Sequence, residues 1–214
     1  MDLGIAGRHA IVCASSRGLG FACADSLARE GVHVTVNGRN DETLAKVVER
    51  LSDAHNVKVS MVVGDITHED TQSRLMEACP APDILVNNNG GPTPGRFADW
   101  DRDAWIAALD ANMLAPLAMI RLVLDGMVER RFGRIVNITS AMVRTPMAPM
   151  GLSTGARTGL TSVAKSLSRE VASANVTINN LLPERVNTER QRQMAEIHSK
   201  TAGITMEEAY EAMA

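Results

Sequence analysis

The sequence predicts an α/β protein, a single domain built on a doubly wound parallel sheet with helices on both faces. Short apolar runs rich in β-branched residues alternate along the chain with amphipathic stretches of helical period, which is typical of parallel strands joined by helices. The chain has 214 residues, of which 45% are hydrophobic and 22% charged, enough to bury one sizeable core. No repeat or Gly/Ser-rich linker marks a second domain.

The alternation predicts seven strands. The apolar runs that carry the pattern span 9–13, 32–36, 57–63, 84–86, 134–138 and 176–182. Helices are predicted over 18–30, 41–54, 68–79, 101–130 and 152–173. Right-handed crossovers would place these helices on both faces of the sheet, so that the carboxyl ends of the strands line a ligand crevice.

The composition changes after Pro183. Residues 184–214 carry many charges and no further strand pattern, and they predict polar helix. We expect this segment to be an arm or lid that covers the substrate. The alternative is a solvated amphipathic helix.

Composition excludes several classes of protein. The formal net charge is -3 with a pI near 6.0, and no dense Lys/Arg cluster indicates a nucleic-acid partner. The three cysteines, Cys13, Cys23 and Cys79, lack C-x-x-C spacing, so neither a disulfide framework nor a metal site is predicted. No apolar run approaches a membrane span of about 20 residues, and the amino terminus does not resemble a signal peptide. We therefore expect a cytoplasmic protein that acts on a small molecule and binds no membrane.

The segment from Ala14 to Gly20 joins the first predicted strand to the first predicted helix. Gly18 and Gly20 would let the main chain approach a pyrophosphate, which the free N–H groups and positive dipole of the helix N-terminus would hold. This context predicts a Rossmann-type dinucleotide site. The predicted contacts are Ser15, Ser16, Arg17, Gly18, Leu19 and Gly20. Ala14 stands where a further glycine is expected, at a cost of up to about 1 kcal/mol if its dihedrals are unusual.

The end of the second predicted strand selects the cofactor. Residues 37–40 read Asn-Gly-Arg-Asn and contain no carboxylate to accept the ribose 2′-hydroxyl of NAD(H). Arg39 and Arg17 instead suit the 2′-phosphate of NADP(H), because guanidinium groups match phosphate oxygens. NADP(H) is therefore predicted in preference to NAD(H), and two solvated surface arginines are the alternative.

In order and spacing, these motifs resemble the short-chain dehydrogenase/reductase family over essentially the whole chain, in the one-domain form close to the 3-oxoacyl-(acyl-carrier-protein) reductases. The strand end Asn87-Asn-Asn-Gly90 resembles the family's Asn-Asn-Ala-Gly, with Asn89 where alanine is usual. The resemblance implies further cofactor contacts at Asp65, Ile66, Asn88, Gly90, Pro183 and Thr188. On the residues alone, Asp65 could instead cap the next loop, and Asn87 could join neighbouring strands.

The resemblance also implies four catalytic positions, and two of them depart from the family. Asn112 and Ser140 match the catalytic asparagine and serine, whereas Ser153 and Arg157 stand where the family has tyrosine and lysine. Ser140 could alternatively be a small polar residue in a turn. A serine hydroxyl is a much weaker acid than a phenol of pKa about 10. Arg157 can hold a ribose and stabilise an oxyanion, but it cannot readily exchange a proton.

These residues predict an NADP(H)-dependent oxidoreductase that reduces a ketone or 3-oxoacyl-type carbonyl, or oxidises the corresponding alcohol. Two alternatives stay open: a catalytically impaired NADP(H)-binding sensor or partner subunit, and a lyase or isomerase on the same fold. The resemblance further implies a homodimer or homotetramer, with 101–130 and 152–173 as candidate interface, and another strand beyond Ala214.

Overall fold

Six parallel strands form the sheet in the computed structural model, which describes residues 2–212. The strands are β1 (His9–Val12), β2 (His33–Gly38), β3 (Val59–Val63), β4 (Ile84–Asn87), β5 (Gly133–Ile138) and β6 (Val176–Leu181). Their order across the sheet is β3-β2-β1-β4-β5-β6. The prediction of seven strands was wrong. Each of the six apolar runs forms one strand, and the described chain has no further run that could form a seventh.

The helices follow the predicted ranges closely. They are α1 (Gly18–Arg29), α2 (Asp41–Ala54), α3 (Glu69–Ala78), α4 (Arg102–Leu109), α5 (Ala115–Glu129), α6 (Gly151–Val171), α7 (Glu189–Ala202) and α8 (Met206–Ala212). The stretch predicted as one helix over 101–130 is divided between α4 and α5 by a π-helical turn, Asp110–Leu114. Pro116 follows this turn and has no N–H to donate, so a regular α-helical pattern cannot run through it.

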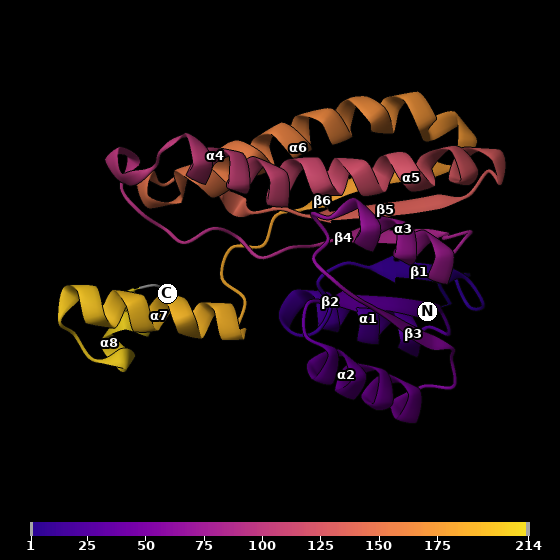
Figure 1. Cartoon of the computed structure of the whole chain (residues 1–214), viewed down its shortest axis with the longest axis horizontal. Helices are drawn as coiled ribbons and strands as arrows, with labels where there is room; N and C mark the ends of the chain where they lie inside the picture. The colour runs from indigo at the N-terminus through magenta and orange to yellow at the C-terminus, as the bar shows by residue number, and fades with distance from the viewer. Residues whose placement is uncertain (1, 213–214) are drawn as a thin grey trace. The chain divides into compact units, whose positions relative to one another are not determined.

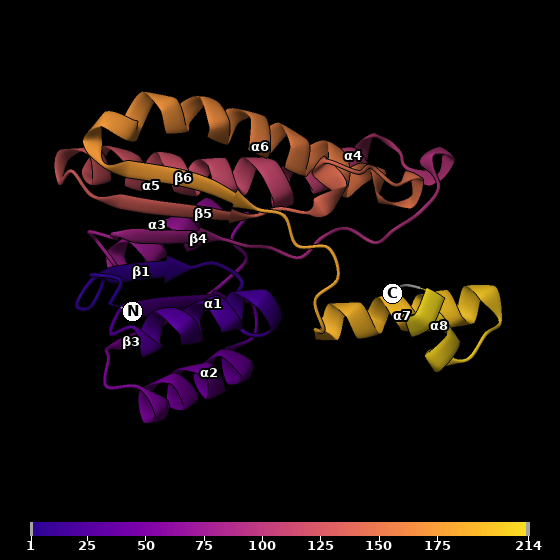
Figure 2. The ribbon, with the colours of Figure 1, turned by 180° about the vertical axis from the view of Figure 1, so that it is seen from behind.

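The helices cover both faces of the sheet. α1 and α2 pack on one face, and α3, α5 and α6 pack on the other (Figures 1 and 2). The chain runs from β1 outward to β3 and then returns to β4 beside β1, and right-handed crossovers in opposite directions place their helices on opposite faces. β1 and β4 therefore mark the point where the strand order reverses, where ligands of such sheets bind. The predicted Rossmann-type architecture is confirmed.

Pro183–Ala214 forms a compact unit separate from Met1–Leu182. In its described part, α7 and α8 pack against each other, with Ala195 and Ala209 buried. Gly203 ends α7 in the left-handed region at φ 68°, which a glycine adopts without strain. The arm is thus helical as predicted. Its function as a lid stays a prediction, and residues 213–214 lie outside the described residues.

Arg102–Glu129, which includes α4 and α5, is long and apolar enough to cross a membrane by length and composition alone. Charged residues divide this stretch, so it is not an uninterrupted apolar run of the kind that the sequence was predicted to lack, although its mean hydropathy is high. In the fold it covers the sheet and buries the side chains of Met119, Ile120, Val123 and Met127. Its exposed large apolar side chains are Ile106, Leu114 and Leu122.

Candidate functional site

The turn between β1 and α1 has the shape of a phosphate-binding turn. Gly18 has a φ of 59° and Ala14 a φ of 44°, both in the left-handed region. A Cβ on Gly20 would collide with the main-chain oxygen of Ala14 and would lie 2.8 Å from Nδ2 of Asn88. Only glycine lets α1 begin this close to the turn. Arg17, the residue before α1, does not cap the helix with its side chain, which leaves the helix N-terminus available to an anion.

Neighbouring strands hold this turn in place through two asparagines. Asn37 on β2 accepts a hydrogen bond from the main-chain N of Ala14 at 3.2 Å through Oδ1, and its Nδ2 donates to the carbonyls of Val62 and Gly64 at 3.1 Å each. Asn88 donates from Nδ2 to the Ala14 carbonyl at 3.0 Å. The prediction placed Asn88 beside the cofactor, but it missed Asn37, whose partners lie on strands remote in sequence.

Ser15 and Leu19 support the turn from inside. Ser15 is buried, and its Oγ donates to the Val12 carbonyl at 2.7 Å and accepts from the Asn37 main-chain N at 3.0 Å. Leu19 packs against the core under α1. Both residues thus have structural roles here, and their contact with a cofactor stays a prediction.

Two charged residues face each other at the ends of β2 and β3. Arg39 and Asp65 form an ion pair with an N–O distance of 3.7 Å, and the Arg39 side chain is 80% exposed. Partial burial raises the pKa of Asp65. The hydrogen bonds from Thr67 and the charges of Arg39 and His68 lower it by a larger amount together, so the net pKa lies below its ordinary value. Asp65 is therefore an anion at neutral pH that also caps its own loop through Thr67.

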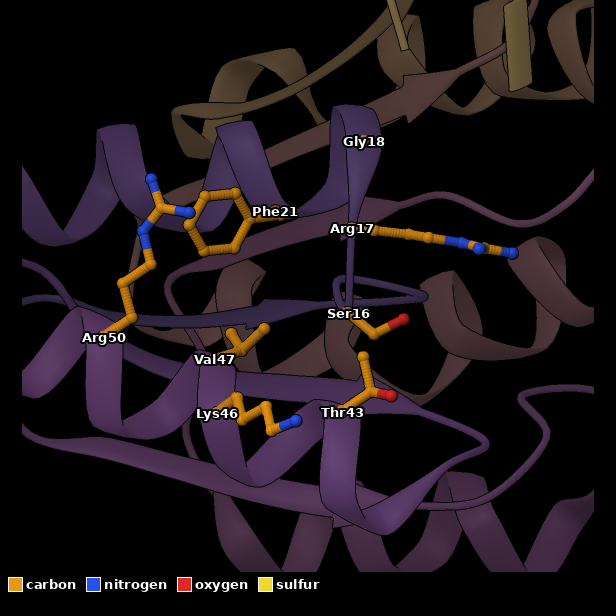
Figure 3. A pocket seen from close by; sticks show the side chains of 8 residues that line it. All are labelled: Ser16, Arg17, Gly18, Phe21, Thr43, Lys46, Val47 and Arg50. Atoms are coloured by element: carbon orange, nitrogen blue, oxygen red, sulfur yellow. The ribbon is translucent and has the colours of Figure 1, made fainter. Parts of the chain in front are cut away.

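An open hollow of about 340 Å³ lies beside the glycine turn, between α1 and α2. Its lining residues are Ser16, Arg17, Gly18, Phe21, Thr43, Lys46, Val47 and Arg50. Arg50 stacks its guanidinium on the Phe21 ring at 4.5 Å, while Arg17 extends in another direction (Figure 3). The lining contains three basic side chains and no acidic one.

An amide ladder joins the carboxyl ends of β4, β5 and β6. Asn87 donates from Nδ2 to Oδ1 of Asn137 at 2.9 Å, and Asn137 donates from Nδ2 to Oδ1 of Asn180 at 3.1 Å. Asn87 is buried, and its side chain joins neighbouring strands. This confirms the alternative given from the sequence for Asn87. The ladder ties together the carboxyl ends of these three strands.

Asn112 lies in the π-helical turn and is 3% exposed. Its Nδ2 lies 3.4 Å from the Gly90 carbonyl, while its Oδ1 is buried without a hydrogen-bond partner among the described residues. An unpartnered acceptor of this kind is costly in a folded protein, so it suits a site that a ligand or water completes.

Ser153 and Arg157 lie one turn apart on α6 and are both buried, at 4% and 8% exposure. Arg157 Nε donates to Ser153 Oγ at 3.2 Å. Its Nη1 donates to the carbonyls of Ile138 at 2.6 Å and Thr139 at 3.2 Å, at the end of β5, and its Nη2 donates to the Asn89 carbonyl at 3.3 Å. The guanidinium thus links α6 to the loops after β4 and β5.

The positions of the other predicted site residues do not indicate a role toward a cofactor or a substrate. Ser140 accepts a hydrogen bond from the Met142 main-chain N at 3.2 Å and caps a short turn after β5. Ile66 is buried in the core. Pro183 and Thr188 belong to the separate unit, where Thr188 precedes α7. Their roles toward a cofactor stay predictions.

The cysteine closest to the turn is not a candidate nucleophile. Burial raises the pKa of Cys13 to about 12, although a hydrogen bond involving the Asn88 main chain lowers it slightly. A thiol with this pKa stays protonated near neutrality. Among the described residues, no group of His, Cys, Asp and Glu could hold a metal ion.

Comparison with known proteins identifies the family. A sequence profile described as short chain dehydrogenase matches residues 8–198. The chain therefore belongs to the short-chain dehydrogenase family, and the resemblance stated from the motifs is confirmed.

Individual relatives include reductases and one protein named inactive. The 3-oxoacyl-(acyl-carrier-protein) reductase FabG of Vibrio harveyi is 30% identical over 188 residues, which cover 87% of this chain and 77% of the relative. The human inactive hydroxysteroid dehydrogenase-like protein 1 is 31% identical over 187 residues, which cover 85% of this chain and 57% of the relative. The L-sorbose reductase of Gluconobacter frateurii, solved with NADPH and L-sorbose, matches with a TM-score of 0.93 and 25% identity, covering 100% of this chain and 83% of that one.

Proposed function

We propose that this protein is an NADP(H)-dependent oxidoreductase that reduces a small ketone or a 3-oxoacyl-type carbonyl, or oxidises the corresponding alcohol. Asn112, Ser140, Ser153 and Arg157 would surround the reacting carbon. The observation that carries the proposal is the buried hydrogen bond from Arg157 Nε to Ser153 Oγ at the carboxyl end of the sheet. It places a fixed cation and a hydroxyl together where such folds bind their ligands.

The residues of the glycine turn fit a dinucleotide. Gly18 and Gly20 leave room for close approach, and the uncapped start of α1 offers N–H groups to a pyrophosphate. Arg17 and Arg39 favour the extra phosphate of NADP(H) over NAD(H), because guanidinium groups match phosphate oxygens. The L-sorbose reductase, solved with NADPH, supports the same choice.

Ser153 would act as a hydrogen-bond donor. NADPH, when bound, supplies a hydride to a carbonyl carbon. Because Arg157 Nε already donates to Ser153 Oγ, the hydroxyl proton is directed to another acceptor, such as a carbonyl oxygen that becomes negative. Arg157 adds positive charge beside that oxygen. A serine hydroxyl is too weak an acid to give up its proton readily, so the proton that completes the alcohol would come from water.

The expected activity is slow but measurable. Loss of a general acid typically lowers a rate by about 10²–10⁴, whereas holding two reactants together contributes roughly 7–11 kcal/mol. Positioning alone can therefore sustain turnover. The test is stopped-flow absorbance of NADPH against a broad panel of ketones and 3-oxoacyl thioesters, with cofactor affinity measured in parallel by calorimetry. Tight NADPH binding without oxidation by any member of the panel would contradict the proposal.

A second candidate is an NADP(H)-binding sensor or partner subunit without turnover. It is favoured by the hydrogen bonds that engage all three guanidinium nitrogens of Arg157 with oxygens of the chain itself. It is also favoured by the human relative named inactive. The double substitution Ser153→Tyr with Arg157→Lys separates the candidates. Turnover that appears only in the double variant supports the sensor, and wild-type turnover that the substitutions leave equal or lower supports the reductase.

A further inference from the structure

Asn89 joins three parts of the candidate site. Its Nδ2 donates to the Ala111 carbonyl in the π-helical turn at 3.1 Å, and its Oδ1 accepts from the Gly90 main-chain N at 2.8 Å. Its own carbonyl accepts from Arg157 Nη2 at 3.3 Å. One residue therefore contacts both the turn that carries Asn112 and the guanidinium that contacts Ser153.

The contact with Ala111 satisfies a carbonyl that the helix itself leaves without a donor. In a regular α-helix, the Ala111 carbonyl would accept from the N–H of Ala115, but that N–H donates to Asp110. In a π-helical pattern it would accept from residue 116, which is proline and has no N–H. The Asn89 side chain supplies the missing donor, and an alanine at this position cannot.

A second contact runs beside the first. Asn112 Nδ2 lies 3.4 Å from the Gly90 carbonyl, so two successive residues of the loop meet two successive residues of the turn. Two adjacent contacts between the same segments restrict both sliding and rotation of one against the other. The peptide that offers its carbonyl to Arg157 belongs to this restrained loop.

We propose that Asn89 is a positioning residue, which fixes the π-helical turn carrying Asn112 and the guanidinium of Arg157 relative to each other. This inference rests on the proposed function for its effect on rate, but its structural part does not. The contacts of Asn89 are with other parts of the chain, and the proposed role needs no contact with substrate or cofactor. It sets the position of groups that do, and a misplacement of about 1 Å can cost up to about a hundredfold in rate.

The test compares Asn89→Ala and Asn89→Asp with a matched control, Asn180→Ala. The aspartate keeps the acceptor for Gly90 and loses the donor for Ala111, so it isolates the contact with the π-helical turn. Asn180→Ala also removes a side-chain amide hydrogen bond, the one from Asn137, but at the end of the amide ladder. It matches the loss of stability without touching the loop.

Two measurements are made on each variant. The first is the solvent exchange of the Arg157 Nε–H in ¹H–¹⁵N spectra, assigned with Arg157→Lys. The second is the single-turnover rate of NADPH oxidation with a substrate from the carbonyl panel, alongside NADPH affinity. We expect both Asn89 variants to speed the Nε–H exchange at least about tenfold and to slow the turnover about tenfold to a hundredfold, with affinity changed less than about threefold.

The outcomes separate the two proposals. For the control Asn180→Ala, we expect only thermal stability to fall. If the Asn89 variants behave in the same way, with the exchange of the Arg157 Nε–H and the turnover unchanged, the positioning role is wrong. If no carbonyl in the panel is reduced by any protein, the proposed function fails, and the Nε–H exchange still decides whether Asn89 positions Arg157. Unchanged exchange in Asn89→Asp alone would contradict the role of the Ala111 contact.

Discussion

Ala14 has a φ of 44° in the turn where the sequence pattern expects glycine. An L-residue in the left-handed region is strained by about 1 kcal/mol, and glycine at this position relieves that strain. Part of the gain in stability is offset, because glycine has greater conformational freedom in the unfolded chain. We expect Ala14→Gly to raise the free energy of unfolding by up to about 1 kcal/mol in urea denaturation.

The control is Ala45→Gly in the exposed interior of α2, where the same substitution should destabilise by about 1 kcal/mol. If Ala14→Gly destabilises as much as this control, the turn does not strain Ala14.

We expect cofactor choice to depend most directly on Arg39. We expect Arg39→Asp to weaken NADPH binding about tenfold to a hundredfold, because it removes a charge-assisted contact to phosphate and adds a negative charge beside Asp65. NADH binding should change far less. Calorimetry with both cofactors measures this.

Arg50→Gln is the control, because Arg50 also lines the hollow but stacks on Phe21. Equal loss of NADPH and NADH affinity in Arg39→Asp would contradict a 2′-phosphate contact.

At the scale of elements, Trp100 holds the loops after β4 and β5 together at the start of α6. A Cβ on Gly151 would lie 2.5 Å from Cζ3 of Trp100, and one on Gly95 would lie 2.8 Å from its Nε1. Gly95 also donates from its main-chain N to the Pro149 carbonyl at 3.0 Å. The indole therefore needs glycines on both sides, and the position of α6, with Ser153 in its first turn, depends on this packing.

We expect Gly151→Ala to lower the free energy of unfolding by about 1–3 kcal/mol, because the added methyl overpacks the rigid ring. Gly126→Ala in α5 is the matched control. Its Cβ would lie 2.9 Å from Nη1 of Arg130, an exposed side chain that can shift at the expense of its hydrogen bond to the Pro82 carbonyl. The higher helix propensity of alanine should keep the net change close to neutral. Chemical denaturation measures the free energy of unfolding of both variants. Equal changes in the two would contradict the role of the Trp100 contact.

At the scale of the whole molecule, the outer surfaces of α4, α5 and α6 expose apolar side chains. These are Ile106, Leu114, Leu122 and Val163, which belong to α4, the π-helical turn, α5 and α6. The three helices lie together on one side of the sheet (Figure 1). The predicted homodimer or homotetramer would bury this surface, as an isologous interface does.

We expect light scattering on the eluting protein to show a dimer or tetramer, and Leu122→Asp to dissociate it by burying a charge in the interface. Met61→Asp is the control, because Met61 is an exposed apolar residue on the edge strand β3. A wild-type monomer, or equal behaviour of the two variants, would contradict this interface.

The architecture and the order of the motifs could be predicted from the sequence alone. Periodic apolar runs predicted the six observed strands and most of the helix boundaries, because burial on a sheet imposes those periods locally. Spacing along the chain also located the glycine turn, and the family resemblance implied that Ser153 and Arg157 stand where tyrosine and lysine are usual. The count of strands and the continuity of 101–130 were the errors, the second because the effect of Pro116 on its helix was not considered.

The hydrogen bonds that hold the site together could be found only in the folded structure. Asn37 had no signal of its own in the sequence, and Asn89 stood out only as a departure from the family's alanine, because the partners of both are main-chain groups of segments remote along the chain. The same is true of Arg157, whose guanidinium reaches carbonyls after β4 and β5. Hydrogen bonds depend on distance and direction, and a pattern along one chain contains neither for residues that meet only after folding.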